Sequence, residues 1–301
     1  MKIGMIGLGK MGANMVRLLR RGDHKVVVWD RNPQTTAAVA REEGVVAADN
    51  LVDLCGKLDS PRTIWCMVPA GAATEQTLEI LEDNLEAGDI VVDGGNSYFK
   101  DSQARARRLD GKGIHLLDAG TSGGIWGLDE GYCLMVGGDM QAFSRLEPVL
   151  STLAPPHGYA HVGPSGAGHY VKMVHNGIEY ALMQAYAEGF ELLKTSPFGV
   201  DLARVADLWN QGSVIRSWLL ELTHDALKKN PDLQGVGAWV ADSGEGRWTV
   251  LDAVENAVAA PTITLALFQR FASRRKEAFS LKMLAALRNE FGGHAIKTEK
   301  E

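Results

Sequence analysis

The sequence contains few cysteines and no cysteine motif. Cys55, Cys66 and Cys133 are an odd number, without a CxxC pair or a close neighbour. A disulfide framework needs paired cysteines, and a structural zinc site needs ligands grouped at short spacing. This usage fits reduced thiols, and we therefore predict a cytoplasmic protein without a metal site.

Long apolar runs and an excess of basic residues are also missing. No stretch approaches the ~18 to 20 apolar residues that span a bilayer. Residues 2–6 read at once as a strand, in place of the basic flank and apolar block of an export signal. The formal net charge of -6 argues against nucleic acid as a partner, because such binding needs a basic face. It does not exclude a small anionic substrate, since a few converging arginines suffice to hold one.

The first half of the chain alternates strand and helix patterns, and the second half is helical. Strand with helix in alternation predicts a parallel sheet covered on both faces. A change of character near Gly166 predicts a boundary after residue 164, followed by a long helix that reaches about Lys194. The predicted strands cover residues 2–6, 25–29, 63–68, 89–92, 114–119 and 132–136.

A glycine motif, GLGKMG, follows the first predicted strand at residues 7–12. Gly7 permits a tight turn, Gly9 lets backbone approach a pyrophosphate, and Gly12 lets helix and sheet pack closely, with the helix N-terminus facing the phosphates. Asp30 ends the second strand at about the expected ~20-residue distance. The predicted fold class is therefore α/β: a Rossmann-type dinucleotide-binding domain (1–164) followed by an all-helical domain (165–301). A glycine turn made for packing alone is the alternative.

Asp30 and Arg31 bear on the choice of cofactor. A carboxylate at residue 30 can bind both ribose hydroxyls and repels a 2′-phosphate, whereas Arg31 could pair with that phosphate. Repulsion at the closer group favours NAD, with NADP less favoured.

The segment GAGHYVKMVHNGIEY at residues 166–180 carries the most chemistry. On a helix, Lys172, His175, Asn176 and Glu179 share one face, because they stand at i, i+3, i+4 and i+7. An ordinary amphipathic helix with a solvated polar face is the alternative. Another side of the helix carries an apolar stripe that we expect to pack against the core: Val171, Val174, Ile178 and Ala181.

These motifs resemble the β-hydroxyacid dehydrogenase superfamily and, more narrowly, the 6-phosphogluconate dehydrogenase family. The segment 166–180 is similar to that family's signature, and DGGNS (93–97) and TSGG (121–124) look like its substrate loops. The resemblance covers nearly the whole chain. The chain resembles a short form of the family, because most of the second helical half of the long members is missing. Simple hydroxyacid dehydrogenases usually lack the glutamate seven residues after the lysine, which makes Glu179 the discriminating residue.

The resemblance implies a mechanism and a site. Neutral Lys172 would take the C3 hydroxyl proton, then as an ammonium polarise the ketone while carbon dioxide leaves, so that no metal is needed. Protonated Glu179 would deliver a proton to C1 of the enediol. The family pattern further implies residues that contact substrate, namely Asn96, Ser122, Gly123, Gly124, His175, Asn176 and Tyr180. Beside Gly7, Gly9, Gly12, Asp30 and Arg31, it puts Met11, Val68 and Asn96 at the cofactor.

The resemblance also implies how the substrate phosphate is held. Arg270 matches the family's arginine in FQR (268–270), and RNEFGGH (288–294) matches a tail whose Arg288 and His294 complete the neighbouring subunit's site. This implies a homodimer or homotetramer. In SGEGRWT (243–249) the chain departs from the family: Ser243 can donate to a phosphate, whereas Glu245 would repel it.

Two rival functions remain open at this point. One is a β-hydroxyacid dehydrogenase of the 3-hydroxyisobutyrate type, which does not decarboxylate. The other is a catalytically silent sensor of nucleotides. Glu179 with Arg270, Arg288 and His294 argues against the first, and retention of Lys172 and Glu179 argues against the second. Preference for NAD would favour a role in sugar-acid catabolism over NADPH supply.

Overall fold

The computed structural model describes residues 1–275 and 277–297. The chain consists of two compact units, Met1–Asn176 and Gly177–Glu301. The boundary between them lies within helix α8 (Ala167–Thr195). The last strand of the sheet ends at Gly163. The predicted boundary after residue 164 stays a prediction.

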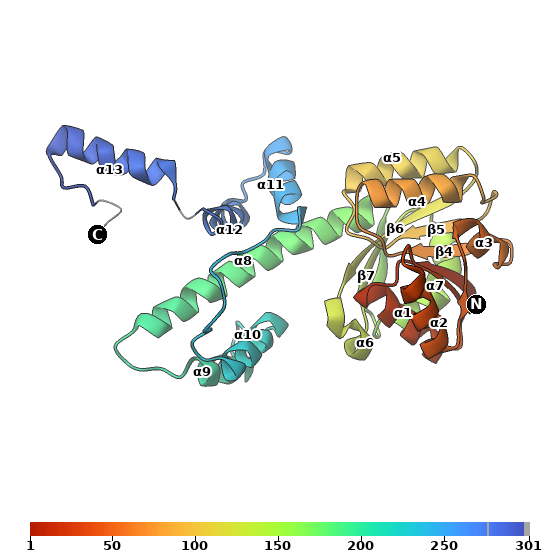
Figure 1. Ribbon diagram of the computed structural model, residues 1–301, viewed down its shortest axis with the longest axis horizontal. Coiled ribbons are helices and arrows are strands. Elements are labelled where there is room, and N and C mark those ends of the chain that lie inside the picture. Colours follow the sequence, from red (N-terminus) through yellow and green to blue (C-terminus); the bar gives the residue numbers. More distant parts are fainter. Residues whose placement is uncertain (276, 298–301) are drawn as a thin grey trace. The chain divides into compact units, whose positions relative to one another are not determined.

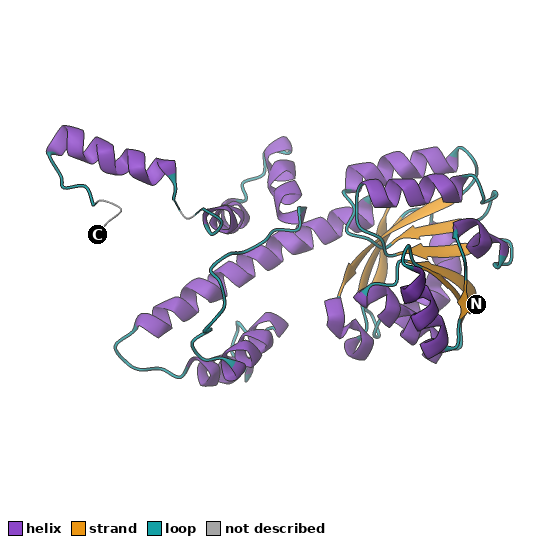
Figure 2. Cartoon of the chain, viewed as in Figure 1, coloured by secondary structure: helices purple, strands orange, loops and turns teal. Residues whose placement is uncertain are grey.

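The first unit contains an eight-stranded sheet with the order β3-β2-β1-β4-β5-β6-β7-β8 (Figures 1 and 2). This is the doubly wound arrangement, in which the strand order reverses beside β1. The predicted Rossmann-type fold is confirmed. The strands are β1 (Lys2–Ile6), β2 (Lys25–Trp29), β3 (Val46–Ala47), β4 (Thr63–Cys66), β5 (Ile90–Asp93), β6 (His115–Ser122), β7 (Cys133–Gly137) and β8 (Tyr159–Gly163).

The sheet is not parallel throughout, which corrects the expectation for it. Strand β7 runs antiparallel to β6, and β8 then runs parallel to β7. The reason is the connection between β6 and β7, where residues 123–132 form only two short helical turns. A parallel crossover needs a dozen or more residues, usually with a full helix.

Helices cover both faces of the sheet, and each face has its own apolar core. One core joins the strands to α1, α2 and α7, through residues such as Leu19 and Leu146. The other joins them to α3, α4 and α5, through residues such as Leu54 and Leu81. The helices of this unit are α1 (Lys10–Arg21), α2 (Pro33–Glu43), α3 (Leu51–Gly56), α4 (Ala72–Glu82), α5 (Phe99–Asp110), η1 (Gly124–Trp126), α6 (Gly127–Glu130) and α7 (Met140–Leu153).

Several of these helices begin at side chains that suit a helix start. Asn32 accepts a hydrogen bond from the backbone of Gln34 ahead of α2, and Asp139 accepts one from Ala142 ahead of α7. Such caps satisfy backbone N–H groups that have no partner within the helix. Helix α1 differs, since Gly9 precedes it and offers no side-chain cap.

The second unit is helical, as the sequence predicts. Beside the later part of α8 it contains α9 (Leu202–Asn210), α10 (Trp218–Lys229), α11 (Glu245–Glu255), α12 (Pro261–Ala272) and α13 (Phe279–Gly292). Among the described residues, none of the helices combines the length and apolarity needed to cross a membrane. The three cysteines are unpaired; burial raises the pKa of the Cys55 thiol to about 11 and that of Cys66 well above its usual range.

Candidate active site

The glycine loop between β1 and α1 has the geometry that the sequence predicts. Gly7 has a φ of +86°, and a Cβ on it would lie 2.4 Å from the carbonyl oxygen of Met67. A Cβ on Gly12 would lie 2.0 Å from the carbonyl oxygen of Gly7, whereas one on Gly9 would meet nothing within 4 Å. Gly7 and Gly12 are thus needed for the fold of the loop. Gly9 leaves the N-terminus of α1 open, as an approaching phosphate requires.

A cavity of about 840 Å³ opens above this loop. It lies at the point where the strand order reverses, which is where doubly wound sheets bind nucleotides. All the residues that the sequence analysis assigns to the cofactor line it: Gly7, Gly9, Met11, Gly12, Asp30, Arg31, Val68 and Asn96.

Asp30 is tied into this cavity by backbone groups. Its carboxylate accepts hydrogen bonds from the N–H of Leu8 at 2.8 Å and of Asn32 at 2.8 Å. A carboxylate has about four acceptor positions, so capacity remains for the two hydroxyls of a ribose. The residues present therefore fit a dinucleotide with a free 2′-hydroxyl.

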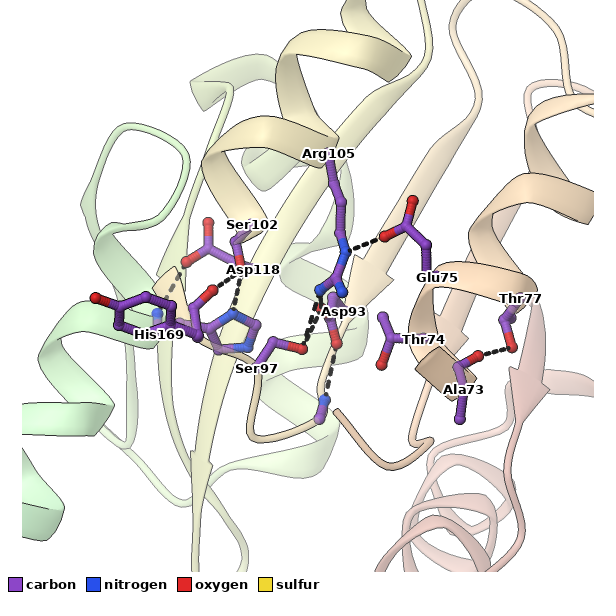
Figure 3. A network of polar contacts seen from close by, with 12 residues as sticks. Ala73, Thr74, Glu75, Thr77, Asp93, Ser97, Ser102, Arg105, Asp118 and His169 are labelled. Atoms are coloured by element: carbon purple, nitrogen blue, oxygen red, sulfur yellow. Dashed lines mark hydrogen bonds and ion pairs between the residues drawn. The ribbon is translucent and has the colours of Figure 1, made fainter. Parts of the chain in front are cut away.

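A buried network of ion pairs and hydrogen bonds holds the loop that carries Asn96 (Figure 3). Asp93 accepts hydrogen bonds from the Ser97 hydroxyl at 2.7 Å and the Gly95 N–H at 3.1 Å. Arg105 of α5 lies 3.5 Å from the same carboxylate and donates to Glu75 at 2.9 Å. Asn96 itself is exposed, so the network fixes the loop and leaves its amide available.

The second predicted substrate loop follows β6 directly. Ser122 is the last residue of the strand, and Gly123 and Gly124 follow with φ values of +132° and +54°. Both values lie in the region that favours glycine. The chain therefore turns sharply at the carboxyl end of β6 and exposes Gly124.

In the first unit, α8 buries its polar side. Lys172 is 7% and Asn176 8% exposed, and Nδ1 of His175 lies 3.0 Å from Oδ1 of Asn176. The expectation that the apolar stripe packs against the core is wrong for two of its members. Val171 is 38% exposed, because in the first unit the sheet packs on the lysine side instead, and Ile178 is 50% exposed in the second unit.

The second unit gathers Tyr180, Ser243 and Arg270. The guanidinium of Arg270 lies 3.6 Å from the centroid of the Tyr180 ring. The Tyr180 hydroxyl accepts the N–H of Ser243 at 3.0 Å and lies 3.2 Å from its hydroxyl. Ser243 donates that hydroxyl to Glu245, which is 2% exposed. Glu179, next to Tyr180, is half-buried.

Arg247, in the first turn of α11, is paired with a carboxylate. Asp242 accepts hydrogen bonds from Arg247 at 2.8 Å and from Arg274 at 2.7 Å. The bond from Arg247 holds the pKa of the Asp242 carboxyl down at about 2, with help from Arg274 and against the effect of burial. Arg270, by contrast, donates to the carbonyl of Ala241 and to no carboxylate that the structure records. Arg270 is therefore the better placed of these arginines to receive a phosphate.

Arg288 and His294 belong to the exposed end of the chain. Helix α13 buries none of its residues, and both side chains are exposed. Among the described residues, the contacts recorded for His294 are with Asn289 and Phe291 of the same tail, and none joins Arg288 or His294 to Arg270 or Ser243. In residues 1–275 and 277–297, no group of three or more His, Cys, Asp and Glu side chains is arranged to hold a metal ion.

A doubly wound sheet with an open glycine loop, followed by a helix that carries a buried lysine and asparagine, defines a nucleotide-dependent dehydrogenase. The NAD binding domain of 6-phosphogluconate dehydrogenase matches residues 2–163, and the C-terminal domain of the same enzyme matches residues 168–300. The chain belongs to the 6-phosphogluconate dehydrogenase family.

Individual relatives agree with this assignment. The chain is 46% identical over 298 residues to an NAD(+)-dependent, decarboxylating 6-phosphogluconate dehydrogenase of Haloferax volcanii, covering 98% of each chain. The solved 6-phosphogluconate dehydrogenase of Plasmodium falciparum, studied with NADP+ and with 6-phosphogluconate, is 29% identical with a TM-score of 0.84, over 100% of this chain and 67% of that one. A 3-hydroxyisobutyrate dehydrogenase of Mycobacterium tuberculosis shares the fold, with 23% identity and a TM-score of 0.72 over 88% of this chain and 90% of that one.

Proposed function

We propose that the chain catalyses the oxidative decarboxylation of 6-phospho-D-gluconate to D-ribulose 5-phosphate and carbon dioxide, with NAD as the preferred oxidant. The observation that carries the proposal is that one helix, α8, bears Lys172, Asn176 and Glu179 and directly follows a dinucleotide-binding sheet. The reaction and cofactor in the name of the Haloferax volcanii relative support it.

Lys172 is the proposed proton acceptor. The chemistry that a bound nicotinamide supplies is acceptance of a hydride from C3 of the substrate. Lys172 takes the proton of the C3 hydroxyl in the same step, and the product is a 3-keto acid. Lys172 is only 7% exposed, so its amine lies largely out of contact with solvent.

Lys172 and Glu179 then divide the second half of the reaction. The ammonium of Lys172 donates a hydrogen bond to the new ketone while the bond between C1 and C2 breaks. The electron pair of that bond moves toward the ketone, carbon dioxide leaves, and an enediol results. The enediol forms because Lys172 transfers its proton to the ketone oxygen. Glu179 then gives a proton to the carbon that becomes C1 of the ketose, while Lys172 takes the enediol hydroxyl proton as the ketone re-forms. Transfer of one proton from the Lys172 ammonium to the Glu179 carboxylate restores both groups. Asn176, His175 and Ser122 orient the substrate.

The preference for NAD is assigned to Asp30. Its carboxylate stands in the cavity above the glycine loop, fixed by Leu8 and Asn32, where it would meet the ribose hydroxyls. A 2′-phosphate at the same place would suffer direct repulsion between like charges.

The phosphate is assigned to Arg270 together with the tail of a second copy of the chain. Arg270 stacks on Tyr180, which directs its guanidinium. Arg288 and His294 lie on an exposed, apolar end of the chain that includes Phe279, Leu281 and Phe291, and such a surface calls for a partner. We therefore propose a homo-oligomer in which each tail completes a neighbour's site.

A comparison of substrates tests the proposed function. Reduction of NAD is followed at the reduced-nicotinamide absorbance with 6-phosphogluconate, gluconate and 3-hydroxyisobutyrate. The proposal predicts that 6-phosphogluconate has the highest kcat/KM by at least about 100-fold, since loss of the phosphate removes several charge-assisted hydrogen bonds. A higher kcat/KM for 3-hydroxyisobutyrate would reject it in favour of a simple hydroxyacid dehydrogenase.

A further inference from the structure

A buried carboxylate from the sheet caps the helix that carries Lys172. Asp118 of β6 is 1% exposed, and its carboxylate accepts the N–H of Gly166 at 2.6 Å and of His169 at 2.8 Å (Figure 3). The first N–H groups of a helix have no partner within it, and a negative charge there also complements the helix dipole. Asp118 thus ties the start of α8 to β6, although the two are far apart in the sequence.

Two residues further along β6, the helix touches the strand at the lysine itself. A Cβ on Gly120 would lie 2.4 Å from Cβ of Lys172 and 2.6 Å from the carbonyl oxygen of Gly168. A Cβ on Gly168 would in turn lie 2.2 Å from the carbonyl oxygen of Asp118. Glycine on both sides therefore lets the helix lie directly on the strand, and the contact fixes the backbone of Lys172.

The same face of β6 continues to the substrate loop. Asp118, Gly120 and Ser122 alternate along the strand, so their side-chain positions point to one face. One face of β6 thus provides the cap of α8 and the contact between Gly120 and Lys172. The loop formed by Ser122, Gly123 and Gly124 begins on the same face.

We propose that Asp118 is a positioning residue: by fixing the first turn of α8 to β6, it sets the distance of Lys172 from the loop that begins at Ser122. This inference rests on the role assigned to Lys172 above. Asp118 itself touches neither substrate nor cofactor in this account, and it acts only through the helix.

A second tie keeps the helix in place when Asp118 is changed. His169 is 2% exposed, and its Nδ1 lies 2.7 Å from the Ser102 hydroxyl of α5. Because this contact does not involve Asp118, we expect Asp118 variants to fold with α8 attached but less firmly fixed.

The test compares Asp118→Asn and Asp118→Ala with Asp139→Asn and Lys172→Met. Asparagine keeps one acceptor oxygen and alanine keeps none. Asp139 also caps a helix, α7, by accepting the Ala142 N–H at 2.8 Å, and no residue of α7 belongs to the site. For each variant kcat, the KM values for 6-phosphogluconate and NAD, and the thermal midpoint are measured.

We expect kcat to fall about 10-fold in Asp118→Asn and about 100-fold in Asp118→Ala, because small misplacements of a reacting group cost this much. The KM for NAD should change less than about threefold, since the cofactor cavity is untouched. Asp139→Asn should lower the thermal midpoint slightly, because the negative charge at the start of α7 is lost while a cap of similar strength remains, and it should keep kcat within about twofold.

An inactive Lys172→Met together with wild-type kcat in both Asp118 variants would overturn the positioning role and leave the proposed function standing. An equal loss of kcat in Asp139→Asn would also overturn it, because the effect would then be one of stability alone. Full activity in Lys172→Met would overturn both the proposed function of the lysine and this inference.

Discussion

The backbone N–H of Leu8, inside the glycine loop, donates a hydrogen bond of 2.8 Å to Oδ2 of Asp30 at the end of β2. Asp30, to which we assign the preference for NAD, therefore also helps to hold the glycine loop. A substitution that removes the whole carboxylate changes both properties at once. A substitution that removes only the charge would change cofactor choice and keep the hydrogen bond to the loop.

Asp30→Asn should narrow the preference for NAD over NADP by at least about tenfold, because the repulsion of a 2′-phosphate is lost while an acceptor for Leu8 remains. Asp30→Ala should narrow it similarly and raise the KM for both cofactors. Steady-state kcat/KM with NAD and NADP measures this. An unchanged ratio in both variants would remove Asp30 from cofactor choice.

Complementation between an inactive variant and a variant with weakened substrate binding tests the shared site. Lys172→Met keeps a normal tail, and Arg288→Ala keeps a normal lysine and should raise the KM for 6-phosphogluconate about tenfold or more. If the tail acts on a neighbour, a random mixture of the two chains, unfolded and refolded together, contains hybrids with one intact site. For a dimer, up to about a quarter of wild-type activity at low substrate should return.

The same variants refolded separately and then combined are the control. This mixture should show no increase in activity until the two kinds of chain exchange between oligomers. If co-refolding also gives no gain although hybrids form, as shown by differently tagged chains, then Arg288 acts within its own chain or not at all.

The hydroxyl of Ser243 is donated to Glu245, so it is not available to a phosphate in this arrangement. We therefore expect Ser243→Ala to change the KM for 6-phosphogluconate less than about threefold. Glu245→Gln should lower that KM, because it removes a buried carboxylate that is connected to Arg270 through Ser243 and Tyr180, while it keeps an acceptor for Ser243. A tenfold rise of KM in Glu245→Gln would instead show that the carboxylate supports substrate binding.

His24 should make stability depend on pH. It is 4% exposed, and burial, followed by the nearby N-terminal ammonium, lowers the pKa of His24 below its ordinary 6.5. Between 6.5 and that lower value, the unfolded chain binds a proton that the folded chain does not, so stability is lost as pH falls through this range.

The loss for one proton is at most about 1.4 kcal/mol per pH unit. Urea unfolding of the wild type and of His24→Gln from pH 8 down to pH 5 measures it. The variant should show a shallower fall. Parallel curves would mean that His24 is not the group responsible.

The local patterns of the sequence predicted the elements around the cofactor well. Strands β1 and β2 have the predicted bounds, because each is a buried apolar run between clear breaks. Strand β3 was missed, since it is only Val46–Ala47 and exposed, and β8 was missed because Tyr159–Gly163 has no continuous apolar run. The direction of β7 depends on the length of one connection, which strand patterns alone do not reveal.

Contacts between distant segments were not predictable in the same way. The spacing of Lys172 and Asn176 on a helix could be read from the sequence, but not that this polar side is the buried one. Nor could the pairing of Asp118 with Gly166 and His169 be found, because it requires β6 to lie against the start of α8. The available signal was an aspartate between Leu117 and Ala119 in a strand, because a buried carboxylate requires hydrogen-bond partners.

Glu179 distinguishes a decarboxylating enzyme from a simple dehydrogenase in this account. Glu179→Gln should reduce the formation of ribulose 5-phosphate by about 100-fold or more, because an amide cannot deliver the proton. Hydride transfer in a single turnover, followed by reduced-nicotinamide absorbance in a stopped-flow instrument, should be nearly unchanged. Equal loss of both steps would assign Glu179 to binding instead.

The most direct test of the central claim is the ratio of carbon dioxide to reduced nicotinamide formed by the wild-type protein from 6-phosphogluconate carrying a label at C1. One carbon dioxide should form for each NAD reduced, with ribulose 5-phosphate as the product. Reduction of NAD without release of the label would contradict it, and would make the chain a dehydrogenase that stops at the keto acid.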